Sequence, residues 1–363
     1  MCIRDRYDIS VSAKGYGRCL ISQLPTDEPG IIKLAPIELK PANLKLEGMV
    51  VDTDDKPVSG ARVYLSGEHQ PAAVTQTDNK GTFRFKAACE GQALLTAVHY
   101  QDPVFAQGMA TTEGGKTNVV IKLESRFGGR TRTVQVTGVV TDADGKPVAG
   151  ADVSVIGAGA ATLRTDSNGR FRTSYRVEEW MIDSGQPLYL VVRHTERNLA
   201  STVEIEEGQT NLNVQLGPGV KLMGRVKNSA GETVQEASVV LQVHFERIIH
   251  TFSQMRISKE SNGSFEIAAL PSDLRYSLLI TARGHGTSQV EVEAEPGQSV
   301  IELEPVVLKT ADRIVAGRVV DEKERPVRGA RVQIVGQGQP TEETITDKDG
   351  RFQLKVCEGE LEI

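Results

Sequence analysis

Apolar and polar residues alternate in short runs along the whole chain, as they do in strands with one buried face. Runs such as ARVYL from Ala61, ADVSV from Ala151 and ARVQIV from Ala330 follow this pattern. They are rich in valine, whose branched side chain favours strands. Turn residues recur about every ten positions, and no stretch has the period of an amphipathic helix. The pattern therefore predicts an all-β protein.

One sequence block occurs four times, and each copy starts with a glycine. The glycines are Gly48, Gly138, Gly224 and Gly317, and the spacings between them are 90, 86 and 93. The first copy reads GMVVDTDDKPVSGARV and the second reads GVVTDADGKPVAGADV. A second block, close to TDxxGxF, follows in each copy and ends at Phe83, Phe171, Phe265 or Phe352. Seven short strands with their loops need about 80–90 residues, so each copy predicts one Ig- or transthyretin-like β-sandwich.

The chain begins and ends inside a repeat. YDISVSAKGYG near the start matches YSLLITARGHG in the third copy, and the fourth copy stops before its last block. The first residues, MCIRDR, resemble a translated sequencing adapter and are set aside. We expect a partial repeat at 1–44, sandwiches at 45–125 and 134–217, a divergent sandwich at 220–309, and a truncated repeat at 313–363. The short linkers between these parts predict an elongated, monomeric rod.

A longer period is also visible. Residues 7–86 match residues 276–355 at a fixed offset of 269, as in IKLAPIELK from Ile32 and IELEPVVLK from Ile301. The offset is the sum of the three spacings between the block glycines. One interpretation is an array that repeats every three domains, and the alternative is chance agreement of loop lengths.

Acidic residues and a glycine lie in the turn after the first strand, as in the DADG of Asp142–Gly145. A calcium loop needs about six oxygen ligands at fixed positions. Here Asp144 is replaced by Ala230 in the third copy and by Lys323 in the fourth. The acidic positions of the second block, such as Asp347, vary between copies as well. Since Asp bonds the following backbone amides and Gly adopts positive φ, we expect turns here and no metal site.

Composition excludes several classes of function. Hydrophobic residues are 39% and charged residues 25% of the chain, which indicates a globular protein. The net charge of −6 is spread along the length, and there is no basic stripe with interleaved aromatic residues to predict nucleic-acid binding. A helix that crosses a bilayer needs about 20 consecutive apolar residues. No apolar run in this sequence approaches that length, so we expect no transmembrane segment.

The sequence contains no motif of a known catalytic site. It lacks HExxH, GxSxG, a P-loop and a GxGxxG that follows a strand. The cysteines, which form no CxxC pair, are Cys2, Cys19, Cys89 and Cys357. The histidines, which show no ligand spacing, are His69, His99, His194, His244, His250 and His285. We therefore expect no catalytic residue, no cofactor and no metal ligand.

Two insertions interrupt the repeat. One is Val177–Pro187, which holds the only tryptophan, Trp180, and the other is His244–Arg256, which includes Phe252. Repeat proteins often place binding residues in such insertions. The alternative is a longer hairpin that covers a sheet edge or packs on a neighbouring domain.

The two blocks together resemble the carboxypeptidase regulatory-like domain. The shared string is GxVxDxxGxPVxGAxV, followed later in the same copy by TDxxGxF. The resemblance is strong at 45–125, 134–217 and 313–363, and weaker at 220–309, where Thr233 replaces the usual proline. Cna-type surface repeats are similar as well. The resemblance implies a transthyretin-like sandwich of about seven strands.

The same resemblance bears on function. The regulatory-like domain is an accessory module beside a metallopeptidase domain, and the catalytic zinc belongs to the latter. Tandem copies imply stalks and accessory modules outside the cell or in the cell envelope. Some Cna-type repeats also carry an isopeptide bond from a lysine to an asparagine or aspartate, which requires a buried lysine.

We therefore expect a non-enzymatic array of β-sandwiches in a secreted or cell-envelope protein, bacterial in origin, that serves as a stalk, spacer or adhesion surface. The alternative is a set of accessory modules that bind a protein or a carbohydrate for an enzyme or receptor domain outside this sequence. Aromatic residues are only 5% of the chain, so few platforms for sugar rings are available. The sequence does not name the ligand.

Overall fold

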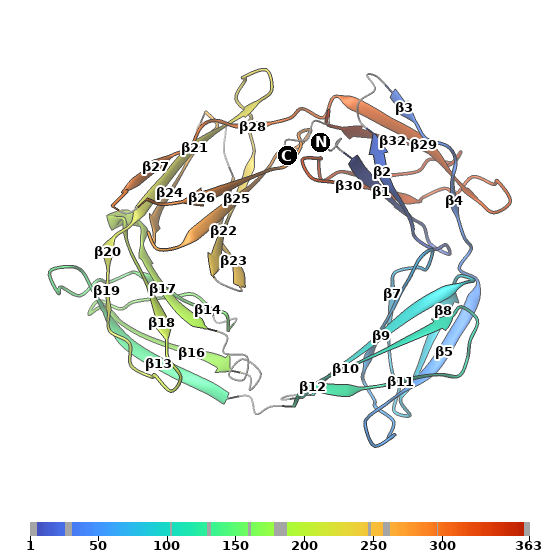
Figure 1. Ribbon diagram of the computed structural model, residues 1–363, viewed down its shortest axis with the longest axis horizontal. Coiled ribbons are helices and arrows are strands. Elements are labelled where there is room, and N and C mark those ends of the chain that lie inside the picture. Colours follow the sequence, from blue (N-terminus) through green and yellow to red (C-terminus); the bar gives the residue numbers. More distant parts are fainter. Residues whose placement is uncertain are drawn as a thin grey trace. The chain divides into compact units, whose positions relative to one another are not determined.

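The protein is described here by a computed structural model that covers residues 6–25, 31–101, 104–128, 132–158, 161–177, 187–245, 248–256, 262–295 and 297–358 (Figure 1). The regular structure in these ranges is β-strand, with one short 3-10 turn, η1 (Thr195–Arg197). The predicted all-β fold is confirmed. The chain divides into two compact units. Unit 1 comprises residues 1–129, 284–286 and 310–363, and unit 2 comprises residues 130–283 and 287–309. Each unit contains two β-sandwiches, so the predicted tandem sandwiches are confirmed as well.

Sandwich 1 lies in unit 1. Its strands are β5 (Leu44–Val51), β6 (Arg62–Ser66), β7 (Ala73–Gln76), β8 (Thr82–Ala88), β9 (Gln92–Gln101), β10 (Val104–Glu113), β11 (Val119–Lys122) and β12 (Glu124–Gly128). One sheet has the order β11-β5-β8, and the other has the order β12-β10-β9-β6-β7. Alternate side chains of the two sheets point inward and form one apolar core.

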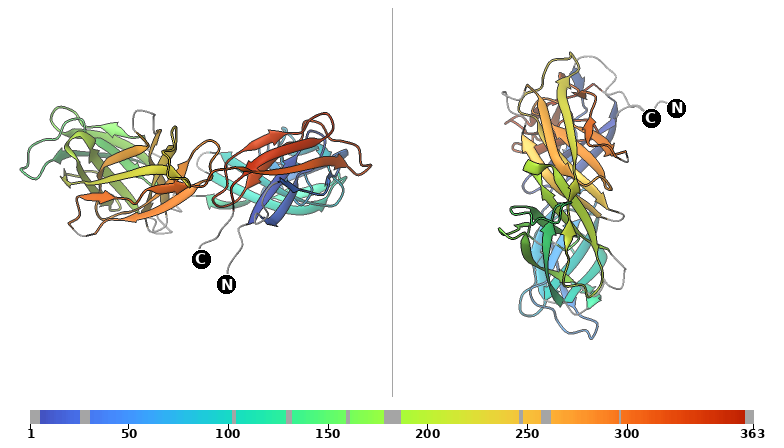
Figure 2. Two further views of the ribbon diagram at one scale, coloured as in Figure 1. Left: turned by 90° about the horizontal axis from the view of Figure 1, so that it is seen from above. Right: turned by 90° about the vertical axis from the view of Figure 1, so that its left-hand side faces the viewer.

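The second sandwich of unit 1, here called the terminal sandwich, combines both ends of the chain. Its strands are β1 (Arg6–Ser12), β2 (Cys19–Pro25), β3 (Ile31–Lys33), β4 (Ile37–Leu39), β29 (Arg313–Asp321), β30 (Arg331–Val335), β31 (Glu343–Ile345) and β32 (Arg351–Val356). β1 pairs with β30, and both β3 and β4 pair with β29 (Figure 2). The two stretches that the sequence presents as separate partial repeats therefore share one core.

Sandwiches 2 and 3 form unit 2. Sandwich 2 has β13 (Arg132–Thr141), β14 (Asp152–Ile156), β15 (Leu163–Arg164), β16 (Arg170–Val177), β17 (Leu188–His194), β18 (Leu199–Ile205), β19 (Val214–Gln215) and β20 (Gly217–Pro218). Sandwich 3 has β21 (Val220–Asn228), β22 (Ser238–Phe245), β23 (Ile248–Arg256), β24 (Ser264–Leu270), β25 (Arg275–Thr281), β26 (Ser288–Glu293), β27 (Val300–Glu302) and β28 (Val306–Leu308). Both repeat the arrangement of sandwich 1, since the strand that carries the block glycine, β13 or β21, lies in the centre of one of the two sheets.

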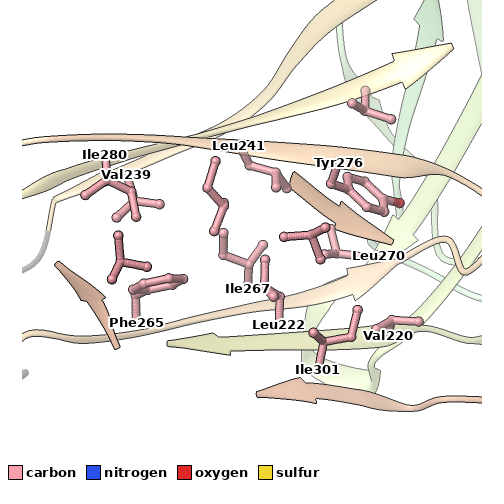
Figure 3. Close-up of a cluster of buried hydrophobic side chains, with 14 of the residues drawn as sticks. Val220, Leu222, Val239, Leu241, Phe265, Ile267, Leu270, Tyr276, Ile280 and Ile301 are labelled. Atoms are coloured by element: carbon pink, nitrogen blue, oxygen red, sulfur yellow. The ribbon is translucent and has the colours of Figure 1, made fainter. Parts of the chain in front are cut away.

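The core of sandwich 3 shows how these sheets meet. Figure 3 shows Leu222 and Ile267 of one sheet directed toward Leu241 and Val239 of the other. Tyr276 is 1% exposed, and its hydroxyl donates a hydrogen bond of 2.7 Å to the Pro271 carbonyl oxygen. This bond satisfies the one polar atom that the ring brings into the core.

The block glycine and the later phenylalanine form a pair in every sandwich. Gly224 on β21 pairs with Phe265 on β24, and the ring lies where a side chain at Gly224 would stand. A Cβ added there would lie 2.5 Å from the nearest ring carbon of Phe265. The equivalent pairs are Gly48–Phe83, Gly138–Phe171 and Gly317–Phe352. The sequence blocks thus encode a ring packed on a backbone without a side chain.

The long offset seen in the sequence recurs in the strand bounds. The strands β1 to β4 start at residues 6, 19, 31 and 37, and β25 to β28 start at 275, 288, 300 and 306. Strands β29 and β30 start at residues 313 and 331, which is the same distance after β5 and β6. The terminal sandwich therefore joins one half that is equivalent to part of sandwich 3 with another that is equivalent to part of sandwich 1.

Candidate functional site

The acidic turns are held by backbone amides. The Asp142 Oδ1 atom accepts hydrogen bonds from the amides of Asp144 and Lys146, at 3.1 and 3.0 Å. Its Oδ2 atom accepts from Arg197 at 2.7 Å, and this bond lowers the pKa of the Asp142 carboxyl. Asp347 accepts from two amides of its own turn in the same way. The carboxylates are thus used to shape turns. Among the described residues no group of three or more His, Cys, Asp or Glu side chains could hold a metal ion.

The threonine of the second block ties this block to the first one. Thr165 is 6% exposed, and its Oγ1 accepts from the Ala151 amide at 2.9 Å and donates to the Val148 carbonyl at 2.7 Å. Thr77 and Thr346 make the same two bonds in their sandwiches. The hydroxyls of these three described threonines are therefore used within the fold and are not available to a ligand.

The cysteines lie apart from any catalytic arrangement. Cys89 and Cys357 are buried, Cys19 is half-buried, and none of these three described cysteines forms a disulfide, whereas Cys2 lies outside the described residues. Gln70 clamps the backbone of Cys89 with two hydrogen bonds of 3.0 Å, one to its carbonyl oxygen and one from its amide. Burial raises the pKa of the Cys89 thiol, so the nucleophilic thiolate is disfavoured.

All six histidines are half-buried, and one of them contacts a serine. His244 Nε2 lies 2.7 Å from Ser277 Oγ and 4.0 Å from a carboxylate oxygen of Glu291. In a Ser-His-acid triad the acid holds the second ring nitrogen, whereas here both groups face the same one. Ser277 is also fully buried. This contact was not anticipated from the sequence, and its geometry does not fit nucleophilic catalysis.

The second insertion packs on a neighbouring sandwich in unit 2. The Arg193 guanidinium of sandwich 2 lies 4.2 Å from the centroid of the Phe252 ring. It also donates to the carbonyl oxygens of Ala268 and Ala269, at 2.6 and 2.8 Å. Burial lowers the pKa of Arg193 to about 10. For Phe252 the structure thus favours packing over ligand binding, while Trp180 of the first insertion lies outside the described residues.

Sandwich 2 carries a basic groove of about 580 Å³ beside its block glycine. Its lining includes Arg170, Arg172 and Asn211. No ion pair of either arginine is found within the described part of the chain, and Thr137 lies opposite Arg172 in the strand pairing. The carboxylate of Asp166 also lines the groove. In sandwich 1 the arginine at the equivalent position pairs instead with a glutamate at 2.8 Å. The terminal sandwich has a similar groove of about 570 Å³, whose charged lining residues are Lys33, Arg318, Arg351 and Asp347.

Lysines remain outside the cores. No lysine is buried in the described ranges of the chain. An isopeptide bond forms from a buried lysine, so the described residues offer no place for one. A search of the same residues also finds no helix long and apolar enough to cross a membrane.

Comparison with known proteins agrees with this geometry. The carboxypeptidase regulatory-like domain matches residues 45–124 and 314–363, which cover sandwich 1 and the C-terminal half of the terminal sandwich. Two parts of the chain, 45–124 and 314–363, therefore match the carboxypeptidase regulatory-like domain family. Carboxypeptidase D of Drosophila melanogaster is 31% identical over 132 residues, which are 32% of this chain and 9% of that protein. The chain thus spans less than a tenth of this relative.

Three solved structures are similar at low scores. A streptococcal ancillary pilin is 10% identical and is matched over 100% of its chain and 72% of this one, with a TM-score of 0.20. The Bacillus anthracis TIE protein is 12% identical over 69% of its chain and 85% of this one, with a TM-score of 0.21. The Bacillus cereus major pilin subunit BcpA is 11% identical over 98% of its chain and 73% of this one, with a TM-score of 0.20. At these scores the likeness carries no argument about what the regulatory-like domains do.

Proposed function

We propose that this chain is a non-enzymatic array of regulatory-like sandwiches in a secreted or cell-envelope protein, and that it serves as a stalk or spacer. The regulatory-like domain is an accessory, non-catalytic type of domain, which supports the first part. The polar residues of the repeated blocks are used within the fold, which is consistent with it. A spacer needs domains that fold separately and joints that transmit load.

The main support for the spacer role is the contact between sandwiches 2 and 3. Asn198, in the left-handed region at φ 48°, follows η1 and faces the start of sandwich 3. The Asn198 side-chain nitrogen, Nδ2, donates to the Gly219 carbonyl at 2.7 Å. Its side-chain oxygen, Oδ1, accepts from the Ala269 backbone amide at 2.7 Å. The Arg193 contacts lie beside these bonds. Such a joint resists bending more than a flexible linker does.

Force spectroscopy on single molecules tests this function. A spacer made of separate sandwiches gives a series of unfolding steps of about 30 nm, since about 90 residues extend by about 3.4 Å each. Replacing Arg193 by alanine should lower the force of the steps from unit 2 and leave those from unit 1 unchanged. One early, low-force extension of the whole chain would contradict the spacer role. Surface labelling of intact source cells tests the proposed location separately.

A second candidate is a set of accessory modules for an acidic carbohydrate, and the basic grooves favour it. Arginine recognises carboxylates in two-point geometry, and Asn211 and Thr137 offer hydrogen bonds to hydroxyl groups. Binding to a uronate polysaccharide should weaken with salt and with replacement of Arg170 and Arg172 by serine. The matched control is Arg84→Ser in sandwich 1, where the arginine is already paired. Equal binding by both variants would remove this candidate.

A further inference from the structure

The terminal sandwich is closed by pairing between two stretches that no short link connects. Its N-terminal half, residues 6–42, supplies β1 to β4, and its C-terminal half, residues 313–358, supplies β29 to β32. Strands β3 and β4 pair with β29 of the other half, and β1 pairs with β30. The buried side chains that the N-terminal half adds to the common core are Ile9, Val11, Ile37 and Leu39. The C-terminal half is thus completed by a separate segment.

The register between the two halves is the one found inside an uninterrupted sandwich. Ile9 of β1 pairs with Ile334 of β30, and the equivalent pair in sandwich 3 is Leu278 of β25 with Leu241 of β22. All four side chains are at most 2% exposed. In sandwich 3 the short stretch 271–274 connects β24 to β25, whereas no such connection joins β32 to β1. Recognition between the halves therefore depends on strand pairing and apolar burial and not on a covalent link.

The N-terminal half reaches the C-terminal half only through the rest of the chain. Sandwiches 1, 2 and 3 lie between residues 42 and 313 along the sequence. The effective concentration of two linked segments falls as the connecting segment becomes longer. A second copy carries the identical N-terminal half, and its binding does not require one chain to return to its own start. It can therefore compete for the C-terminal half as the protein concentration rises.

Both neighbours of the terminal sandwich contact it through the same kind of turn. A Cβ added to Gly17, in the turn between β1 and β2, would lie 1.7 Å from the backbone oxygen of His69 in sandwich 1. The equivalent turn, residues 284–286 of unit 1, meets the C-terminal half, where a Cβ added to Gly286 would lie 2.0 Å from the backbone oxygen of Gly338. Glycine permits these close approaches. Each half thus keeps its own neighbour, whichever copy closes the core between them.

We propose that the N-terminal half of one molecule completes the C-terminal half of a second copy, so that the chain assembles head to tail through a shared terminal sandwich. The exchanged sandwich contains the same strand pairs and the same core as the closed one, as in domain swapping. Because the two contacting surfaces differ, the contact is heterologous, and it produces closed rings, of which a reciprocal dimer is the smallest, or open filaments. This inference goes beyond the spacer role and does not depend on it.

Two full-length variants that cannot close by themselves test the exchange. Ile9→Asp damages the N-terminal half and Ile334→Asp the C-terminal half, because each places an unpaired charge in the core. Either variant alone should stay monomeric. In an equimolar mixture the intact N-terminal half of one variant should complete the intact C-terminal half of the other, so sedimentation velocity should show a heterodimer of about twice the monomer mass.

The control for this mixture is a chain with both substitutions. Mixed with the Ile9→Asp variant it supplies no intact N-terminal half, and no heterodimer should form. Hydrogen exchange verifies that sandwiches 1, 2 and 3 remain folded in every variant.

A crosslink detects the exchange without damage to the core. Ser12 of β1 pairs with Arg331 of β30, and neither side chain is buried. One chain carries Ser12→Cys and another carries Arg331→Cys, and the two are refolded together at low and at high concentration and then mildly oxidised. A disulfide between positions 12 and 331 can then form only between molecules, and its peptide should become more abundant, by mass spectrometry, at high concentration. The control replaces Ser12→Cys by Leu20→Cys, since Leu20 is 54% exposed on β2, which pairs with β1 and not with β30.

Two results would overturn the proposal. The first is an equimolar mixture of Ile9→Asp and Ile334→Asp that sediments as monomers at every concentration. The second is a crosslink between positions 12 and 331 that is no more frequent than the one from the Leu20→Cys control. Neither result bears on the spacer role, because the force measurement tests that role on single molecules.

Discussion

At the scale of single residues, the repeated turn allows one backbone position to be compared four times. The position after the acidic pair has positive φ in every sandwich, with Gly145 at 77° and Gly231 at 81°. In sandwich 1 the same position is Asp55 at 62°, and in the terminal sandwich it is Glu324 at 59°. Glycine adopts this conformation freely, whereas a side chain raises its energy by about 1–2 kcal/mol. Two of the four turns therefore carry local strain.

Replacing Glu324 by glycine should stabilise the terminal sandwich by about 1 kcal/mol, because the strain of the left-handed backbone is removed. Chemical denaturation of the chain measures the change. The control is Gly145→Ala, which meets no atom within 4 Å and should destabilise sandwich 2 through its backbone alone. The two changes in unfolding free energy need not be equal in size. A loss of stability with Glu324→Gly would contradict the assignment of strain.

The buried threonine of the second block gives another prediction at this scale. Thr165→Val keeps the shape and removes the hydroxyl, so the Ala151 amide and the Val148 carbonyl lose their partners. A cost of about 1–3 kcal/mol is expected for each such buried group. Hydrogen exchange at the Ala151 amide reports the loss directly. Thr165→Ser retains the hydroxyl and should retain the protection, and identical exchange in both variants would show that this bond is not made.

At the scale of elements, much of the fold could be predicted from the sequence because each block serves one local structure. The alternation around Ala61 and Ala151 predicted strands, and the DADG of Asp142–Gly145 predicted a turn. The joint of Arg193 with Phe252 was beyond prediction, because it depends on how two separately folded sandwiches meet. The basic groove was also missed, since it depends on which residue lies opposite Arg172 in the neighbouring strand.

The pairing of block glycine and phenylalanine predicts a specific coupling. Gly224→Ala should destabilise sandwich 3 by about 1–3 kcal/mol through overpacking against the Phe265 ring. Because the nearest atoms to the new Cβ are carbons of the Phe265 ring, adding Phe265→Leu to the Gly224→Ala chain should recover part of the lost stability. At Gly138 the new Cβ also clashes with the backbone oxygen of Leu212, so replacing Phe171 by leucine should not recover the stability lost in Gly138→Ala. Two double-mutant cycles by denaturation compare the sites, and equal rescue at both would contradict this account.

The acidic turn of sandwich 2 should make stability depend on pH. The hydrogen bond from Arg197 lowers the pKa of the Asp142 carboxyl in the folded protein, so the folded state binds this proton more weakly than the unfolded one. The contribution is therefore present above the unfolded value of about 3.9 and is lost as pH falls through the folded pKa. Thermal unfolding across this range should show a smaller decline for Asp142→Asn. Asp144→Asn is the control, since Asp144 pairs only with the exposed Lys146.

At the scale of the whole molecule, the terminal sandwich links the two ends of the sequence. Ile9 and Val11 of β1 are fully buried, and they pair with Ile334 and Val332 of β30. The matching blocks at both ends could be recognised in the sequence, but their pairing could not, because the three other sandwiches lie between these strands along the chain. Long-range pairing of this kind depends on the closure of the whole chain.

A chain that ends at Lys309 should lose order in residues 6–39, because β1, β3 and β4 lose the strands with which they pair. Hydrogen exchange should then show unprotected amides in β1, with protection in sandwiches 2 and 3 unchanged. Substituting Ile334 by aspartate in the full chain is the matched variant, since it places a charge in the same core. Full protection of Ile9 in the shortened chain would show that β1 has another partner.

The hybrid composition of the terminal sandwich has a consequence for the gene. Its N-terminal half is equivalent to part of sandwich 3 and its C-terminal half to part of sandwich 1, yet the two halves close one core. In this chain, two halves that are equivalent to parts of different copies thus close one core. Unequal crossing-over between copies, at the point where β8, β24 or β32 ends, joins segments that already pack together. We expect that recombination at these points changes the length of an array while each sandwich keeps a closed core.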